Sequence, residues 1–171
     1  MIGSCETTYD SYRRSLKLFG YTVDQSFFDD IHSGVSWPQL VVKYFPKMDT
    51  RVQQLVREKK SEFFSAALNG ISWNTDLIDF LSGKNWYLVS NGSKESSLKI
   101  LESFSGVSRP QEIVGPNQDL LPKPSADMYR FILNRYKIQA NQAIAIEDSE
   151  IGLRSARLAG LNAFQISHFC P

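Results

Sequence analysis

The second half of the chain alternates short apolar segments with helix-like segments, and this alternation constrains the fold more than any other feature. The apolar segments are NWYLVS, EIVG, AIAIE and NAFQI. Each is short and almost entirely hydrophobic, which is typical of strands buried on both faces of a parallel sheet. The helix-like segments between them predict right-handed crossovers. We therefore expect an α/β layered core over residues 73–171.

The first half, residues 1–72, shows only the period of amphipathic helices and is expected to form a separate helical domain. Four helices are predicted, in TTYDSYRRSLKLFG, TVDQSFFDDIHSG, GVSWPQLVVKYFP and DTRVQQLVREKKSEFFSAALNG. Gly20 and Gly70 are placed to end the first and the last. The candidate N-caps are short polar residues: Asp24 or Ser26, and Asp49 or Thr50.

Composition excludes several classes of protein. The 171 residues carry 19 basic and 18 acidic side chains, a net charge of +1, so no electrostatic argument favours nucleic acid or an acidic membrane as a partner. Two cysteines at opposite ends argue against a disulfide scaffold. No apolar run approaches the roughly 20 residues of a membrane span, and no secretory signal is evident. We expect a cytoplasmic protein, and the sequence says nothing of its oligomeric state.

Polar residues follow the predicted strands at the edge where parallel sheets bind ligands. A hydroxyl with free backbone N–H groups and an ammonium can neutralise phosphate oxygens. A pair of carboxylates suits Mg²⁺, which prefers oxygen ligands and bridges to phosphate. The residues concerned are Ser90, Asn91 and Gly92 after one strand, Lys123 in a loop between prolines, and Glu147 and Asp148 after another strand.

Each of these motifs has a simpler interpretation when taken alone. SNGS before a helix is also typical of a turn with an N-cap. Lys123 suits a solvated loop, and EDS before a helix suits capping, because carboxylates favour a helix N-terminus. The phosphate interpretation rests on the three motifs together.

Together, YLVSNGS, KPSADMY and AIAIEDSEIGLRSARLAG resemble the second, third and fourth motifs of the haloacid dehalogenase superfamily of phosphohydrolases. The last motif is similar to the branch with β-phosphoglucomutase and small sugar-phosphate phosphatases. The resemblance implies a Rossmann-like core with an N-terminal helical cap. It implies that Ser90 and Lys123 bind the transferring phosphoryl group, with Asn91 and Gly92 assisting. It also implies that Asp148 binds Mg²⁺, with Glu147 beside it.

The superfamily's first motif, a strand ending in Asp-x-Asp-Gly-Thr, occurs nowhere in these 171 residues. Its first Asp is the nucleophile. The start of the chain resembles the continuation of that motif, with Met1 and Ile2 at an apolar pair, Gly3 at an Asp and Ser4 at a Ser. We therefore expect a 5′-truncated reading of a longer gene, with the first core strand absent. An upstream sequence without that motif in frame would refute this expectation.

Without the nucleophile the supplied residues are expected to show no turnover, and two inner strand edges are expected to be exposed. Two hypotheses stay open. In one, the protein is a Mg²⁺-dependent phosphatase of a small phosphorylated metabolite, such as a sugar phosphate. In the other, the chain is complete and serves as a non-catalytic phosphate-binding or interaction module.

The segment SGVSWPQL resembles the cap loop that closes over the active site in this branch. Gly34 and Ser36 match the Gly-Val-Ser stretch that β-phosphoglucomutase follows with an Arg for a second phosphate. Here Trp37 stands in that place, which argues against a mutase of doubly phosphorylated sugars. Trp37 suits stacking on a flat substrate face, or packing of the cap against the core.

Overall fold

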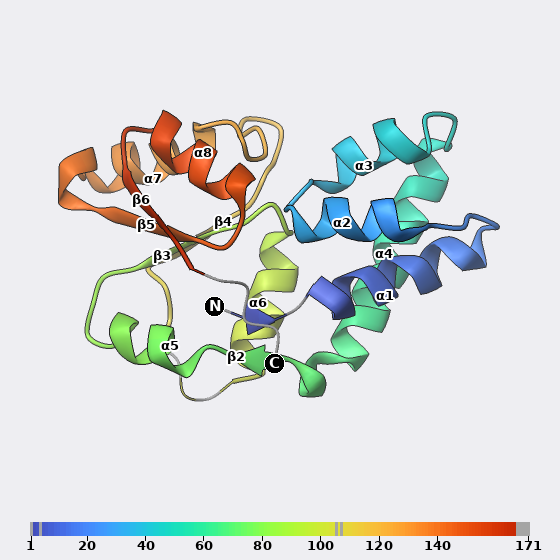
Figure 1. Ribbon diagram of the computed structural model, residues 1–171, viewed down its shortest axis with the longest axis horizontal. Coiled ribbons are helices and arrows are strands. Elements are labelled where there is room, and N and C mark those ends of the chain that lie inside the picture. The colour runs from blue at the N-terminus through green and yellow to red at the C-terminus, as the bar shows by residue number, and fades with distance from the viewer. Residues whose placement is uncertain (1, 4, 105, 107, 167–171) are drawn as a thin grey trace. The chain divides into compact units, whose positions relative to one another are not determined.

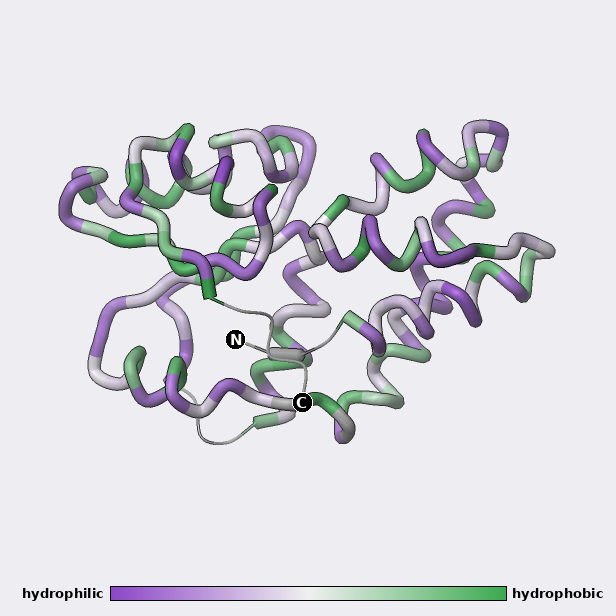
Figure 2. Tube along the Cα trace, in the orientation of Figure 1, coloured by the Kyte–Doolittle hydropathy of each residue, from purple (hydrophilic) through white to green (hydrophobic). Residues whose placement is uncertain are grey.

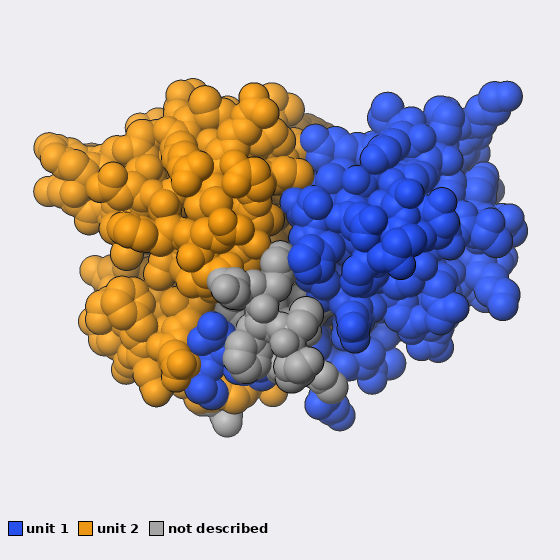
Figure 3. All heavy atoms as spheres, viewed as in Figure 1, with its two compact units in different colours: residues 1–75, 169–171 blue, residues 76–168 orange. Residues whose placement is uncertain are grey.

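The computed structural model describes residues 2–3, 5–104, 106 and 108–166. The expectations about Met1 and Ser4, and one of the two cysteines, Cys170, lie outside these residues. The chain divides into two compact units, unit 1 over Met1–Thr75 with Phe169–Pro171 and unit 2 over Asp76–His168 (Figure 3). Within the described part of the chain, no helix combines the length and apolar character that crossing a membrane requires.

Unit 1 is built from the four expected helices. They are α1 (Cys5–Leu18), α2 (Gln25–His32), α3 (Trp37–Tyr44) and α4 (Thr50–Ala66). A 3₁₀ turn follows at Leu68–Gly70, so α4 ends before the predicted Gly70. The expectation of helices alone was wrong in one detail, because β1 (Ile2–Gly3) pairs antiparallel with β2 (Ser72–Trp73) and brings the two ends of this unit together.

Local signals in the sequence set the ends of these helices. Asp24 caps α2 by accepting from the Phe27 N–H at 3.3 Å, and Asp49 caps α4 by accepting from the Arg51 N–H at 2.8 Å. Gly20 follows α1 with φ of +80°, a left-handed conformation that costs glycine little. The caps and the stop therefore lie where short-range chemistry predicts them.

One apolar cluster fills unit 1. Hydrophobic and hydrophilic stretches alternate along its helices, as Figure 2 shows. Phe27 is fully buried at the centre, with its ring edge-on to Tyr12 at 6.0 Å and to Tyr44 at 5.2 Å. The buried members are Leu16, Phe27, Ile31, Trp37, Leu40, Val41, Phe45, Met48 and Val56.

Unit 2 follows the predicted alternation of strands and helices (Figure 1). Its strands are β3 (Tyr87–Val89), β4 (Glu112–Val114), β5 (Ile144–Glu147) and β6 (Asn162–Gln165). Its helices are α5 (Thr75–Leu81, beginning at the unit boundary), α6 (Lys94–Glu102), α7 (Asp127–Tyr136) and α8 (Glu150–Leu158), with a 3₁₀ turn at Ala140–Gln142.

The strands of unit 2 form two parallel pairs. β3 pairs with β4 in the register Leu88↔Ile113, and β5 pairs with β6 in the register Ala145↔Ala163. Among the described residues no backbone ladder joins the pairs, so β3 and β5 are each hydrogen-bonded along one edge only. The parallel direction matches the expectation, whereas the division into pairs differs from one continuous sheet.

Helix α7 packs against both strand pairs. Tyr129 belongs to a cluster with Ala145, Ala156 and Leu161 beside β5, while Met128 and Ile132 pack with Val114 of β4. Val89 of β3 lies against both clusters. The end of β3, the end of β5 and the start of α7 are thereby held together, and the polar residues of the next section project from these points.

Candidate functional site

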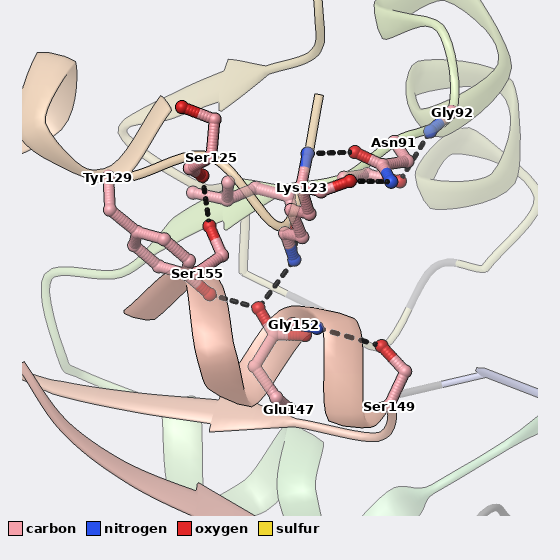
Figure 4. Close-up of polar contacts among 11 residues, drawn as sticks. Asn91, Gly92, Lys123, Ser125, Tyr129, Glu147, Ser149, Gly152 and Ser155 are labelled. Carbon is pink, nitrogen blue, oxygen red and sulfur yellow. Dashed lines mark hydrogen bonds and ion pairs between the residues drawn. The ribbon is translucent and has the colours of Figure 1, made fainter. Parts of the chain in front are cut away.

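Lys123 links the ends of the two strand pairs. It lies between β4 and α7 and is only 6% exposed. Its Nζ donates to the carbonyl oxygen of Val89 at the end of β3, at 2.9 Å, and to Oε1 of Glu147 at the end of β5, at 2.5 Å (Figure 4). An ammonium has three N–H donors. Two have partners among the described residues, which leaves one to donate to a ligand.

The side chain of Asn91 fixes the backbone of Lys123. Its Oδ1 accepts from the Lys123 N–H at 2.7 Å, and its Nδ2 donates to the Lys123 carbonyl oxygen at 3.2 Å. This pair of bonds fastens the lysine loop to the loop after β3 (Figure 4). The Asn91 amide therefore acts on the protein here, and its predicted contact with phosphate stays a prediction.

The sequence left open whether the SNGS segment caps a helix or binds an anion, and in the structure two different serines suit these two roles. The Ser93 hydroxyl caps α6 by accepting from the Ser96 N–H at 3.1 Å. Ser90 continues the β3–β4 pairing through its N–H, which donates to the Val114 carbonyl at 3.0 Å, and its Oγ accepts from the Gly92 N–H at 3.0 Å. Gly92 thus directs its N–H at Ser90, while the half-buried Ser90 hydroxyl keeps a proton to donate.

Glu147 is buried and held on every side. Its Oε1 accepts from Lys123 and from the hydroxyl of Tyr129 in α7. Its Oε2 lies against Gly152 in α8, where an added Cβ would overlap it. Burial raises the pKa of Tyr129 above its ordinary value, and the negative charge of Glu147 and the hydrogen bond to it raise that pKa further.

Glu147 and Asp148 are neighbours in sequence with different surroundings. Glu147 is 7% exposed and already carries two strong donors. Asp148 is half-buried, and the described residues give its side chain no hydrogen bond or ion pair. The next residue, Ser149, caps α8 by accepting from the Gly152 N–H at 3.2 Å. Asp148 is therefore the carboxylate that can take a new ligand.

The carboxylate oxygens of this site meet only part of what a Mg²⁺ ion requires of its ligands. Mg²⁺ is often held by one or two carboxylates, with water and substrate phosphate completing its shell. Asp148 matches that pattern, whereas the second oxygen of Glu147 packs against Gly152. Within the described ranges there is no group of three or more His, Cys, Asp or Glu that could hold a metal. The site therefore fits a cation that also binds phosphate, and does not form a closed protein cage.

The predicted cap residues lie in unit 1 and have local structural roles. Gly34 has φ of +86°, which favours glycine. Ser36 is 2% exposed and donates through its N–H and its hydroxyl to Oε1 of Gln39, at 3.0 and 2.7 Å. Trp37 is buried, with its ring stacked on Tyr12 at 5.0 Å. Trp37 therefore packs within its own unit, and substrate contact by these three residues stays a prediction.

Sequence reasoning missed Tyr129 and the Val89 carbonyl. One signal for Tyr129 was available: it lies on the apolar face of a predicted helix, and a buried tyrosine hydroxyl needs a polar partner. A second tie was also missed, because the fully buried Ser155 of α8 donates to the Ser125 carbonyl at 2.5 Å and fastens the lysine loop to that helix (Figure 4).

Comparisons with solved structures support the same fold. CbbY from Rhodobacter sphaeroides in complex with phosphate has a TM-score of 0.83 and 19% identity, over 99% of this chain and 82% of that one. A mutant of CbbY in complex with xylulose-(1,5)bisphosphate gives 0.84 at the same identity and coverage. A hydrolase from Pseudomonas syringae gives 0.78 at 13%, over 95% and 78%. At these identities the likeness shows the fold alone.

No protein of curated function matches this chain. A family model for haloacid dehalogenase-like hydrolases matches residues 1–166, nearly the whole length. The match includes all three motifs that meet at the ends of β3 and β5. The chain therefore belongs to the haloacid dehalogenase-like hydrolase family.

Proposed function

We propose that unit 2 binds the phosphate group of a small phosphorylated metabolite, such as a sugar phosphate, as part of a Mg²⁺-dependent phosphatase. The observation that carries this proposal is the buried Lys123 ammonium. Two of its donors are bonded to Val89 and Glu147, and the third is free to meet an anion. A desolvated ammonium of this kind interacts strongly with a phosphate oxygen.

The other site residues take the roles that the family implies. We propose that the Ser90 hydroxyl donates to phosphate, with Asn91 and Gly92 shaping the loop around it. Asp148 would hold Mg²⁺, with Glu147 oriented beside it. The cation would neutralise phosphate charge and polarise its oxygens. The phosphate and xylulose bisphosphate ligands of CbbY support a phosphorylated sugar as the substrate class.

We propose that these 171 residues bind phosphate without transferring it. Covalent phosphoryl transfer needs a carboxylate in line with the phosphorus, and the sequence contains no Asp-x-Asp pair. The same observation favours the second candidate, a non-catalytic phosphate-binding or interaction module. A cytoplasmic setting without nucleic-acid or membrane partners remains an expectation from composition.

Two measurements test the proposal. Titration with inorganic phosphate, with and without Mg²⁺, should give saturable binding that Lys123→Met abolishes, with exposed Lys94→Met as the control. Hydrolysis of an aryl phosphate should be absent in this chain and should appear when a strand ending in Asp-x-Asp-Gly-Thr is fused to its start. Turnover by the unextended chain would contradict the assignment of the nucleophile. Phosphate binding with no turnover in the fusion would favour the module.

A further inference from the structure

Tyr129 contacts both charged members of the buried cluster. Its hydroxyl donates to Oε1 of Glu147. The Nζ of Lys123 lies 5.4 Å from the centre of its ring, within the range of a cation–π contact. Tyr129 itself is 9% exposed and lies in the first turn of α7, where neighbouring Met128 is fully buried. Helix packing therefore fixes the tyrosine before any ligand arrives.

The Tyr129 hydroxyl and Gly152 together restrict how the Glu147 carboxylate can lie. One oxygen accepts from both Lys123 and Tyr129, and the other faces the bare Cα of Gly152. A carboxylate that turned about its last bond would lose the tyrosine or collide with α8. Glu147 is thus held as a fixed acceptor.

A fixed acceptor in turn fixes the lysine. The ammonium is bonded to Glu147 and to the Val89 carbonyl, and two directed hydrogen bonds set the direction of the third N–H. The direction of this donor therefore depends on Glu147, and the position of Glu147 depends on Tyr129.

We propose that Tyr129 is a positioning residue of the phosphate site, which acts through Glu147 to aim the free N–H of Lys123 at a phosphate oxygen. This inference rests on the proposed function of the site. It assigns no catalytic contact to Tyr129. It predicts that removing the hydroxyl oxygen of the buried Tyr129, which bonds to Glu147, changes both the Lys123 ammonium and the affinity for phosphate.

The test compares Tyr129→Phe with Tyr136→Phe. Tyr136 lies on the same helix, and its hydroxyl donates to Oε2 of Glu112 at 3.1 Å, outside the Lys123 cluster. The first readout is the ¹⁵N NMR signal of the Lys123 ammonium without phosphate, assigned by its loss in Lys123→Met. We expect a sharp, slowly exchanging signal in the unmodified chain. It should broaden or shift in Tyr129→Phe and stay unchanged in Tyr136→Phe.

The second readout is the affinity for inorganic phosphate. Tyr129→Phe should weaken it about fivefold, the size expected from losing one hydrogen bond in a polar network. Tyr136→Phe should leave it unchanged. An unaltered Lys123 signal and affinity in Tyr129→Phe would overturn the proposal, and so would equal effects of the two variants.

Two further outcomes keep the test decisive. If Tyr129→Phe does not fold, the unmodified chain is examined for a slowly exchanging tyrosine hydroxyl proton coupled to Glu147, and its absence would overturn the proposal. If phosphate leaves the Lys123 signal of the unmodified chain unmoved, the proposed phosphate function fails. The phosphate-free signal still reports whether Tyr129 positions Lys123.

Discussion

The two units of this chain are stabilised in different ways. Unit 1 has one continuous apolar cluster around Phe27, and its buried serine hydroxyls bond locally, within α1 or at the start of α3. Unit 2 has two smaller clusters, and between them it buries Lys123 and Glu147. A buried ion pair contributes little net stability, because desolvation offsets its attraction. Unit 2 thus retains an arrangement that stability alone does not favour, as expected where a site must bind charge.

The largest effect is expected from cutting the centre of unit 1. Phe27→Ala removes a fully buried ring and should lower the free energy of unfolding by about 4 kcal/mol. Phe28→Ala, at the neighbouring half-buried position, should cost much less. Urea unfolding followed by circular dichroism measures both. Equal losses would show that the unit 1 core does not depend on its central ring.

In unit 2, removing the single negative charge of Glu147 should lower the free energy of unfolding almost as much. Glu147→Gln leaves the Lys123 ammonium buried without its counter-charge, and the free energy of unfolding should fall by about 3 kcal/mol. Glu150→Gln, an exposed neighbour at the start of α8, should change it by less than about 0.5 kcal/mol. If the two variants lose the same free energy of unfolding, the Lys123–Glu147 pair does not distinguish the stabilisation of unit 2 from that of unit 1.

Unit 1 also partly buries a charged side chain, that of Lys60, which tests whether a desolvated charge destabilises that unit. Lys60 lies over the rings of Tyr12 and Phe64, and burial, with a smaller contribution from Arg57, lowers its pKa to about 8. The unfolded chain therefore holds this proton more tightly, so folding is penalised in full below pH 8, and the penalty disappears as the pH rises toward the usual lysine pKa.

Lys60→Met should accordingly stabilise the chain by about 1–2 kcal/mol at pH 7, with the gain shrinking between pH 8 and 10.5. Lys59→Met provides the control, since the Lys59 side chain is 42% exposed and paired with Glu62 at 2.8 Å. Urea midpoints measured across this pH range decide the matter. A gain that does not depend on pH would indicate an effect of packing alone.

The smallest effect is expected at the start of α3. Ser36→Ala removes one hydroxyl from the pair of bonds to Gln39 and should cost about 1 kcal/mol. Exposed Ser26→Ala in α2 should be neutral or slightly stabilising. Thermal unfolding resolves this difference. A neutral Ser36→Ala would leave the serine open to a contact with substrate.

Sequence reasoning located the helices and strands well because their signals are local. Apolar spacing, Asp24 and Asp49 as caps and Gly20 as a stop all act within a few residues. The division of strands into pairs depends on hydrogen bonds between distant segments, which no local pattern records. The two-residue strands β1 and β2 are too short to show a period.

The sequence predicted where the candidate site residues lie along the fold, but not the contacts among them. Ser90 follows β3, Glu147 ends β5 and Asp148 follows it, and Lys123 lies in the loop before α7, as the sequence pattern predicted. The side-chain amide of Asn91 bonds to the backbone of Lys123, and the carboxylate of Glu147 accepts from the hydroxyl of Tyr129. Which atom faces which depends on rotamers fixed by packing across α7 and α8, and such contacts are invisible in a single sequence.

The position of Lys123 has a mechanical consequence. No ladder connects the two strand pairs within the described residues, and this ammonium forms a cross-link from Val89 to Glu147. A ligand that bonds to the same ammonium is thermodynamically linked to the opening of the pairs, because a ligand that binds only the closed form lowers the population of the open form. Amide hydrogen exchange at the ends of β3 and β5 would then report how much of the site is occupied by ligand. One measurement would follow both ligand binding and the association of the two strand pairs.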